Sequence, residues 1–178
     1  MKKIGVFYGS DTGCTEAVME KLKDIIGSIA DFFDVSQLKQ KEELLAYSNL
    51  ILAIPTWYDG ELQSDWEVFF PEFQKIDFEG RKVAIVGLGD QIGYGEFFVD
   101  GIGILGKSAI ENQAQLIGLC ALDGYDFEES QALIEIDGET YFLGLPLDED
   151  NQPDETDQRL QAWTEQVLEE FELKAELA

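Results

Sequence analysis

A segment rich in hydroxyl groups and glycine has the composition of a phosphate-binding loop. It lies between an apolar run at 4–8 and a stretch with helical spacing of apolar residues at 15–26, and it reads Gly9-Ser10-Asp11-Thr12-Gly13-Cys14-Thr15. Three hydroxyls and the free backbone N–H groups of a helix N-terminus can enclose a phosphate dianion without a lysine. An ordinary helix cap accounts for only one Ser or Thr. The segment therefore predicts a phosphate site at the start of the first helix.

Cys14 lies in this segment but lacks the partner of a phosphatase nucleophile. A phosphatase loop needs an Arg six residues after its Cys, and here that position is Glu20. We therefore expect Cys14 to contribute its backbone N–H. Cys120 is the only other cysteine, so the chain has too few thiols for a disulfide framework or a four-thiolate metal centre.

Two further loops carry large aromatic rings, and each follows a buried apolar run. They are Pro55-Thr56-Trp57-Tyr58-Asp59-Gly60 and Gly87-Leu88-Gly89-Asp90-Gln91-Ile92-Gly93-Tyr94. In open α/β sheets, ligands bind at the carboxyl ends of the strands, where such loops meet. A single loop aromatic is more often a lid on the core. Trp57 and Tyr94 together with a phosphate loop favour a phosphorylated planar ligand held between two rings.

A glycine-rich stretch further along matches the nucleotide P-loop pattern letter for letter. It reads Gly101-Ile102-Gly103-Ile104-Leu105-Gly106-Lys107-Ser108. A P-loop has to leave a buried strand and open a helix. The preceding apolar run already ends at Leu88, and an aromatic, acidic loop comes before Gly101. We therefore interpret the stretch as a helix whose apolar residues face the core and whose glycines allow close packing.

The composition excludes several classes of protein. The 178 residues include 37 Asp and Glu, 12 Lys and Arg and no His, which gives a formal net charge of −25. Nucleic-acid binding requires clustered cations, which are scarce here. Without histidine there is no Ser-His-Asp triad and no His-ligated zinc. The acidic surface favours solubility, and it can also dock a cationic partner.

Alternating apolar runs and amphipathic stretches indicate an α/β fold. Strands are expected at 4–8, 32–35, 50–54, 83–88 and 115–122, and helices at 15–26, 42–47, 65–73, 99–113 and 155–171. This alternation favours an open, doubly wound parallel sheet with helices on both faces. We expect one domain over residues 1–178, because the chain has no internal repeat and no interdomain linker.

One segment interrupts the alternation. Residues 123–140 precede a second apolar run at 141–145. We interpret them as an insertion into the last strand, with a hairpin that turns at Asp137-Gly138. The first apolar run is too short for a signal peptide and no segment reaches the length of a membrane span, so we expect a cytoplasmic protein.

Five segments, in order and with matching spacing, resemble those of long-chain flavodoxins. They are Ser10-Asp11-Thr12-Gly13-Cys14-Thr15, Pro55-Thr56-Trp57, Gly89-Asp90-Gln91 with Tyr94, Gly124-Tyr125-Asp126-Phe127, and Leu147-Asp148-Glu149-Asp150-Asn151-Gln152-Pro153. The resemblance covers essentially the whole chain. It implies a five-stranded sheet of order 2-1-3-4-5, noncovalent binding of FMN and transport of single electrons. The insertion fits the long-chain class, whose fifth strand is interrupted.

The resemblance also implies roles for individual residues. The segment from Ser10 to Thr15 would hold the FMN phosphate. Trp57 and Tyr94 would stack on opposite faces of the isoalloxazine ring, and Gly89 and Asp90 would meet its pyrimidine edge. An aromatic, acidic site of this kind disfavours the anionic hydroquinone, which would make the flavoprotein a low-potential redox carrier.

The loop that begins with Pro55 and Thr56 has a further implied role. The Tyr58-Asp59 peptide is where the family turns a carbonyl toward the N5–H of the semiquinone. Gly60 would ease that turn, because glycine tolerates positive φ.

The family's partners include NADP-dependent flavodoxin or ferredoxin reductases and acceptor redox enzymes with basic surfaces. We therefore expect a monomeric electron-transport protein, not an enzyme, whose association with partners weakens with salt. One alternative is an FMN-dependent NAD(P)H:quinone reductase of the flavodoxin superfamily, which would need a dimer and a nicotinamide site. Another is a phospho-receiver, which would need an aspartate where Pro55-Thr56 stand.

Overall fold

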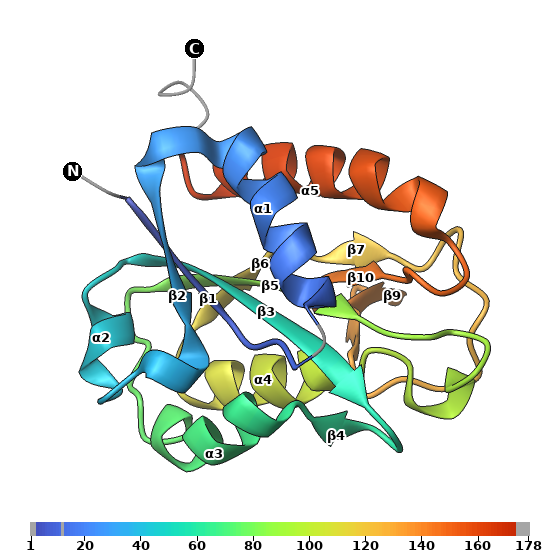
Figure 1. Ribbon diagram of the computed structural model, residues 1–178, viewed down its shortest axis with the longest axis horizontal. Helices are drawn as coiled ribbons and strands as arrows, with labels where there is room; N and C mark the ends of the chain where they lie inside the picture. The colour runs from blue at the N-terminus through green and yellow to red at the C-terminus, as the bar shows by residue number, and fades with distance from the viewer. Residues whose placement is uncertain (1–2, 12, 174–178) are drawn as a thin grey trace.

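Buried apolar runs form the central sheet of the molecule (Figure 1). The computed structural model describes residues 3–11 and 13–173. Its main sheet has the strand order β10-β5-β3-β1-β2, and every neighbouring pair in this series is parallel. The strands are β1 Ile4–Tyr8, β2 Ala30–Asp34, β3 Asn49–Trp57, β5 Lys82–Leu88 and β10 Leu145–Leu147. The predicted order 2-1-3-4-5 is therefore confirmed.

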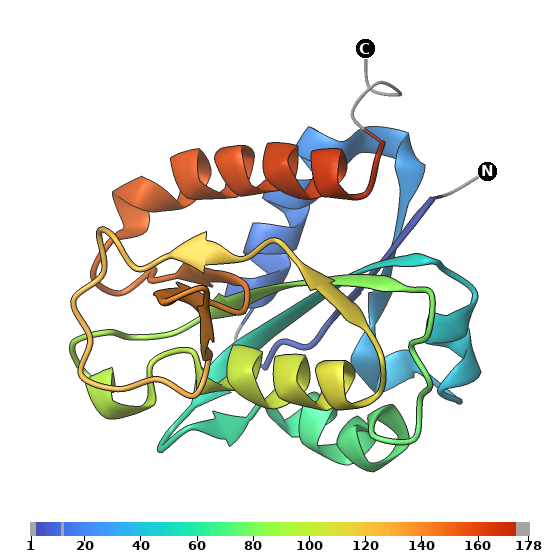
Figure 2. The same ribbon diagram turned by 180° about the vertical axis from the view of Figure 1, so that it is seen from behind.

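Helices cover both faces of this sheet, as Figures 1 and 2 show. One face carries α1 Cys14–Ile26 and α5 Thr156–Glu170, and the other carries α2 Glu42–Leu45, α3 Ser64–Phe73 and α4 Asp100–Glu111. Because the strands are apolar on both sides, one buried cluster forms under each helix layer. This confirms the doubly wound α/β fold. None of the helices within the described ranges is long and apolar enough to cross a membrane.

The fifth strand of the sheet is interrupted. β6 Gln115–Ile117 pairs with the first half of β5, and β10 pairs with the second half. The chain between them forms a separate antiparallel sheet from β7 Cys120–Ala121, β9 Glu139–Phe142 and β8 Leu133–Ile136, in that order. The hairpin between β8 and β9 turns at Asp137 and Gly138, whose φ values are 52° and 83°. Two positive φ angles suit such a turn, so the predicted hairpin is confirmed. An insertion in the fifth strand is also confirmed, but it extends over residues 118–144 and not only over 123–140.

The strand predicted at 115–122 is wrong in its extent, because it ends at Ile117. Gly118 has a φ of +71° and turns the chain toward α5. Its N–H donates to Glu170 Oε2 (3.1 Å), and its carbonyl accepts from Trp163 Nε1 (2.8 Å). A Cβ at Gly118 would lie 2.8 Å from that same Trp163 nitrogen. The close contact with Trp163 therefore requires glycine at the point where the insertion begins.

Three other apolar runs also differ by more than one residue from their predicted bounds. The strand predicted at 50–54 is β3, which begins at Asn49 and continues to Trp57, so Pro55, Thr56 and Trp57 lie in the strand and not in a loop after it. The strand predicted at 32–35 is β2, which begins at Ala30 and ends at Asp34. The run at 141–145 divides between β9 and β10, because Gly144 passes so close to Ile85 that a Cβ would overlap its carbonyl oxygen. The remaining short elements are β4 Glu61–Leu62 and the 3-10 helices Gly27–Ile29, Val35–Gln37, Gly95–Phe97 and Pro153–Glu155.

The glycine-rich stretch at 101–108 lies within α4, which is preceded by a 3-10 helix and not by a strand. Gly103 packs against the insertion, and a Cβ there would overlap the carbonyl oxygen of Gln131. Gly101 packs against the side chains of Ile54 and Thr56, at 3.3 Å from the position of a Cβ. The interpretation of this stretch as a helix with close-packed glycines is confirmed, and the P-loop alternative is excluded.

Candidate functional site

A cavity of about 330 Å³ opens at the carboxyl ends of the parallel strands. It lies at the side toward which the arrowheads of β3 and β5 point in Figure 1. Ligands of open α/β sheets bind at this edge, because the connections after neighbouring strands diverge there. The lining residues are Cys14, Pro55, Thr56, Trp57, Leu88, Gly89, Asp90, Tyr94, Phe97, Glu149 and Asp150.

The cavity brings together predicted residues from three separate segments. Cys14 comes from the start of α1, and Gly89, Asp90 and Tyr94 come from the loop after β5. The end of β3 supplies Pro55, Thr56 and Trp57. The remaining predicted residues do not line the cavity. Four of them flank Cys14, namely Ser10, Asp11, Gly13 and Thr15. Three others form the turn beyond Trp57, namely Tyr58, Asp59 and Gly60. Thr12 lies outside the described residues.

Leu88, Phe97, Glu149 and Asp150 also line the cavity but were not among the predicted site residues. Glu149 and Asp150 follow the carboxyl end of β10, so the rule that selected the other loops also applies to them. Leu88 is the last residue of β5. Phe97 ends a short 3-10 helix, and no sequence pattern marks it as a site residue.

The connection from β1 to α1 presents an open helix turn and an unpaired hydroxyl. Gly13 has a φ of 83°, and its N–H donates to Ser10 Oγ (3.0 Å), so the Ser10 hydroxyl holds the turn. The first N–H groups of a helix have no partner within the helix. Thr15 is fully buried, and its Oγ1 has no hydrogen-bond partner within the described ranges 3–11 and 13–173. A buried hydroxyl without a partner is costly, so this turn fits a bound oxyanion such as a phosphate.

Asp11 has a different role from the one expected of a phosphate-loop residue. Its carboxylate accepts from Ser64 Oγ (2.8 Å) and from Gln63 Nε2 (3.0 Å). Gln63 is buried, and its Oε1 accepts from Trp66 N (3.2 Å), which caps α3. Gly9 is required beside it, because a Cβ there would overlap Gln63 Oε1. The Asp11 side chain therefore fixes the loop to α3, and only its backbone is available to an anion.

The turn after Trp57 has an unusual backbone. Thr56 pairs with Leu62 across the β3–β4 ladder, and the chain reverses between them. Tyr58 has a φ of 44°, and Gly60 has a φ of +83°. A Cβ at Gly60 would also lie 2.5 Å from Asp100 Oδ2, so both the conformation and the space require glycine here. Tyr58 is 59% exposed, and its ring meets the Trp57 ring edge-on at 5.5 Å between centroids.

The cavity is lined by carboxylates, and no Lys or Arg is found among its described lining residues. Asp90 Oδ1 accepts from Gly93 N (2.6 Å), Ile92 N (3.1 Å) and Asn151 Nδ2 (2.8 Å). Burial alone would raise the pKa of Asp90, but these donors outweigh it and the pKa is lowered. The pKa of Asp150 is raised by burial and by its anionic neighbours Asp90, Asp148 and Glu149. The site therefore opposes additional negative charge.

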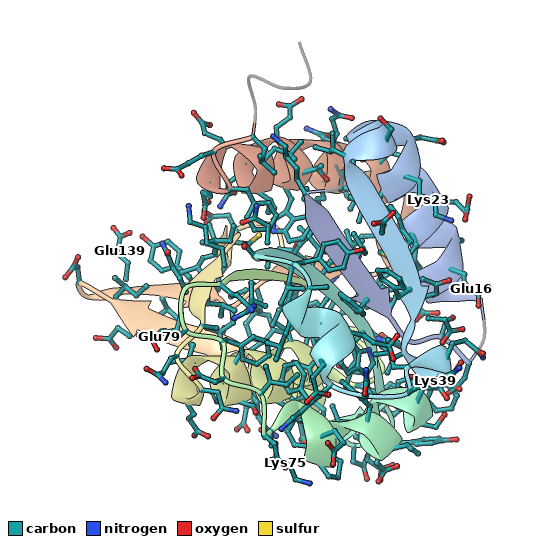
Figure 3. The ribbon with its side chains drawn as sticks, turned by 90° about the vertical axis from the view of Figure 1, so that its left-hand side faces the viewer. Glu16, Lys23, Lys39, Lys75, Glu79 and Glu139 are labelled. Carbon is teal, nitrogen blue, oxygen red and sulfur yellow. The ribbon has the colours of Figure 1, made fainter. Side chains whose placement is uncertain are left out.

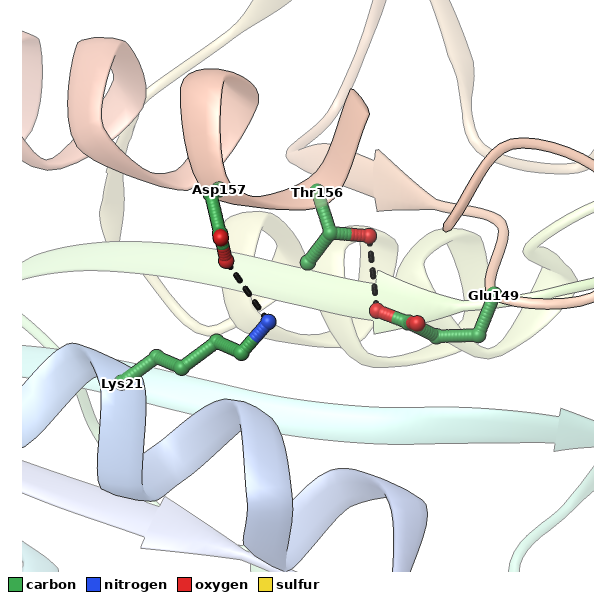
Figure 4. A network of polar contacts seen from close by, with 4 residues as sticks. All are labelled: Lys21, Glu149, Thr156 and Asp157. Atoms are coloured by element: carbon green, nitrogen blue, oxygen red, sulfur yellow. Dashed lines mark hydrogen bonds and ion pairs between the residues drawn. The ribbon is translucent and has the colours of Figure 1, made fainter. Parts of the chain in front are cut away.

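Glu149 is held in the cavity wall by the start of α5 (Figure 4). Its Oε1 accepts from Thr156 Oγ1 (2.6 Å), and Thr156 is buried. One residue further, Asp157 forms an ion pair with Lys21 of α1 (2.6 Å). These contacts hold Glu149 against the start of α5 and join that start to the middle of α1.

Comparison with known proteins places the chain in a family. Residues 6–163 match the family model described as Flavodoxin. The chain belongs to the flavodoxin family. The curated flavodoxin of Nostoc sp. (strain PCC 7120) is 47% identical over 173 residues, which cover 97% of this chain and 99% of that protein. Flavodoxin 1 of Escherichia coli K12 is 42% identical over 170 residues, with 95% and 94% covered. Membership of the flavodoxin family, which the five sequence segments implied, is thereby confirmed.

Solved structures of the flavodoxin family share the fold. A crystal structure of Fusobacterium nucleatum flavodoxin bound to flavin mononucleotide has a TM-score of 0.88 at 35% identity, covering 96% of this chain and 99% of that one. Oxidised flavodoxin 2 of Bacillus cereus has a TM-score of 0.70 at 26% identity, covering 94% and 99%. The family's architecture therefore extends over nearly the whole of this chain.

We expect the thiols of Cys14 and Cys120 to differ sharply in their rates of alkylation. Burial, with a smaller contribution from Glu170, raises the pKa of the Cys120 thiol to about 12. Cys14 is exposed and lines the cavity. Because the thiolate is the nucleophile, iodoacetamide at about pH 8 should label Cys14 and leave Cys120 unmodified, as peptide mass mapping would measure. The Cys14→Ser variant should then stay unlabelled, whereas rapid labelling of Cys120 would contradict the expectation.

Proposed function

We propose that the chain binds FMN noncovalently in this cavity and carries single electrons between redox enzymes. The observation that carries the proposal is the buried, unpaired hydroxyl of Thr15 at the first turn of α1, beside a cavity with aromatic walls. FMN matches both features, because it has a phosphate for the turn and a flat ring for the cavity. The FMN-bound structure of Fusobacterium nucleatum flavodoxin gives independent support.

In this proposal, the loop from Ser10 to Thr15 binds the phosphate. Its donors are the hydroxyls and the N–H groups of the open helix turn, with Asp11 contributing only its backbone because its carboxylate bonds to α3. Trp57 and Tyr94 cover the two faces of the ring, and Gly89 and Asp90 meet its polar edge. Pro55 and Thr56 complete the wall of the cavity.

The turn of Tyr58, Asp59 and Gly60 is the part of the proposed site that changes conformation. Tyr58 has a positive φ, which is uncommon for a residue with a side chain, and Gly60 adopts one without strain. A peptide between such residues can reorient at a small cost in free energy. The Tyr58 carbonyl would then turn toward the bound ring and accept a hydrogen bond from it.

The charges of the chain set the potential of the bound cofactor. FMN supplies reversible one-electron transfer when it is bound. Full reduction of FMN adds negative charge, and Asp90, Glu149 and Asp150 line the cavity of a chain with a net charge of −25. These charges and the aromatic walls disfavour the added charge, so the protein lowers the potential of the last electron.

Titration of the apoprotein with FMN tests the proposal directly. The purified protein should show a flavin absorption spectrum, or the apoprotein should take up FMN in a one-to-one ratio. Bound FMN should slow the alkylation of Cys14, because Cys14 lines the cavity. A colourless protein that does not take up FMN would end the proposal. Steady oxidation of NADPH by the protein alone would instead support the quinone reductase alternative.

We further propose that the partners are an NADP-dependent flavodoxin or ferredoxin reductase and acceptor enzymes with basic surfaces. The support is the net charge of −25 and the exposed acidic groups near the cavity, among them Asp11, Asp59 and Glu61. The protein is proposed to act as a monomer in the cytoplasm, where its two cysteines remain as free thiols.

The rate of association with such a reductase should depend on salt concentration, and it should depend more on acidic residues near the cavity than on acidic residues elsewhere on the surface. The association rate, measured by stopped flow, should fall as salt rises toward about 0.5 M, because screening removes the attraction between the two surfaces. Glu61→Gln beside Trp57 should slow association at low salt. Glu79→Gln is the matched control, since Glu79 is exposed at the opposite end of the sheet (Figure 3). Equal effects of the two variants would exclude docking at the cavity.

A further inference from the structure

We propose that Gln91 and Asp148 are positioning residues, whose hydrogen bonds attach the cofactor loop to the insertion and fix its conformation. The loop in question runs from Gly89 to Tyr94 and forms one wall of the cavity. The inference rests on the proposed FMN function, and it gives the insertion a role in shaping the site.

Asp148 is a buried carboxylate directly after β10, with no exposed surface. Its Oδ2 accepts from both the backbone N–H (3.0 Å) and the side-chain Nε2 (2.8 Å) of Gln91. Its Oδ1 accepts from the N–H groups of Asp150 (3.1 Å) and Asn151 (3.0 Å). A buried charge needs such donors, because transfer from water is costly. The loops after β5 and β10 are therefore joined at one carboxylate.

Gln91 connects this carboxylate to the insertion. The residue is 3% exposed, and its Oε1 accepts from the backbone N–H of Asp126 (2.5 Å). The amide nitrogen of Gln91 thus bonds to Asp148, directly after the last strand, and the amide oxygen bonds to the insertion. A shorter or apolar side chain at this position would leave Asp148 and the Asp126 N–H without these partners.

The insertion is itself anchored at this point. Tyr125 Oη donates to the carbonyl of Pro146 (2.7 Å), and the Arg159 guanidinium lies 4.1 Å from the centre of the Tyr125 ring. The carbonyl of Gly124 accepts from Gln152 Nε2 (2.9 Å) and from Arg159 Nη2 (3.2 Å). The two residues that precede Asp126 in the insertion are therefore held by contacts with Arg159 of α5, with Gln152 and with Pro146 of the last strand.

The same contacts extend into the cavity. Asn151 Nδ2 donates to Asp148 Oδ2 (2.8 Å) and to Asp90 Oδ1 (2.8 Å), and Asp90 lines the cavity. The N–H of Tyr94 donates to the carbonyl of Asp90 (3.0 Å). Asp90 and Tyr94 are thus linked to Asp148 through short, direct contacts. Release of Gln91 should loosen both residues and admit water beside the ring.

The Gln91→Leu variant tests the inference at nearly constant side-chain size. We expect its Kd for FMN to rise at least tenfold, with the same factor for riboflavin, because the loop faces the ring and not the phosphate. The potential of the last electron should also rise, since an open cavity opposes negative charge less. Each tenfold difference between the affinity losses of the one-electron-reduced and fully reduced forms corresponds to about 59 mV in this potential.

Gln166→Leu is the matched control. Gln166 Nε2 donates to the Leu119 carbonyl at the start of the insertion (3.1 Å) and to Glu170 Oε1 (2.7 Å). It does not line the cofactor cavity. The control therefore removes a similar contact between the insertion and α5, and it should leave the affinity for FMN and both potentials unchanged.

The outcomes separate this inference from the proposed function. If the wild-type apoprotein does not bind FMN, the proposed function fails. If it binds FMN, and Gln91→Leu matches the Gln166→Leu control in affinity and potential, only the inference is overturned. Should Gln91→Leu fail to fold, Asn151→Ala keeps the test available, because it removes only the link between Asp90 and Asp148. An unchanged potential in that variant would likewise overturn the inference.

Discussion

Replacing Trp57 with alanine is expected to weaken FMN binding roughly 30- to 150-fold, because truncation of a central aromatic side chain costs about 2–3 kcal/mol. Trp57 ends β3 and lines the cavity. Its indole would supply one of the two ring faces against the cofactor, and alanine would leave that face to water. Fluorescence titration of the apoprotein with FMN measures the loss.

The same substitution should raise the potential of the last electron. Water in the place of the indole stabilises negative charge, so the fully reduced form should lose less affinity than the one-electron-reduced form. The sign follows from linkage, because a change that weakens binding of the one-electron-reduced form more than binding of the fully reduced form makes the last reduction step easier. Anaerobic titration with a reference dye reports the potential.

Two further variants control for the loss of an aromatic residue. Trp57→Phe keeps a ring in the wall and should recover most of the affinity. Tyr141→Ala removes a ring from the insertion hairpin, outside the cavity lining, and should change neither affinity nor potential. Unchanged affinity and potential in Trp57→Ala would remove Trp57 from the site.

The order of the main sheet could be anticipated because its strands have strong local signals. β3 and β5 are nearly continuous apolar runs that end in turn residues, as strands buried on both faces require. The turn at Asp137-Gly138 could also be predicted from the sequence, since positive φ at both positions favours these residue types. These features depend on residues close together in the sequence, so patterns of residue types predict them.

Features set by distant contacts could not be anticipated in the same way. The apolar residues at 115–122 predict one continuous strand, but the strand ends at Ile117, where Gly118 turns the chain and contacts Glu170 and Trp163 of α5. Gln63 is buried beside Asp11 although the two are far apart in sequence. A residue type alone does not reveal which partner will satisfy its hydrogen bonds.

In the candidate site too, some features could be predicted from local sequence, and others depend on contacts between distant residues. Loops that follow strands were predictable, because the carboxyl ends of parallel strands must share one edge. The side-chain role of Asp11 and the bridge from Asp148 through Gln91 to Asp126 depend on geometry between loops. The sequence therefore predicts which loops meet at the candidate site, and the structure adds how the walls of the cavity are held.

Replacing Thr15 with valine should have opposite effects on the apoprotein and on FMN binding. The Thr15 hydroxyl is buried and has no hydrogen-bond partner among the residues that the structure describes. Removing an unsatisfied polar group should stabilise the apoprotein by about 1 kcal/mol, which urea unfolding would measure. In the complex, a hydroxyl that donates to a phosphate contributes about 1.5–3 kcal/mol, so FMN affinity should fall roughly 10- to 150-fold.

Riboflavin and a second threonine make this test specific. Riboflavin lacks the phosphate, so its affinity should not change in Thr15→Val. Thr164 is also fully buried, but its Oγ1 donates to the Leu160 carbonyl in α5 (2.6 Å). Thr164→Val should therefore destabilise the apoprotein and leave FMN affinity unchanged. If Thr15→Val weakened riboflavin and FMN binding equally, or destabilised the apoprotein as Thr164→Val does, the first turn of α1 would not be the phosphate site.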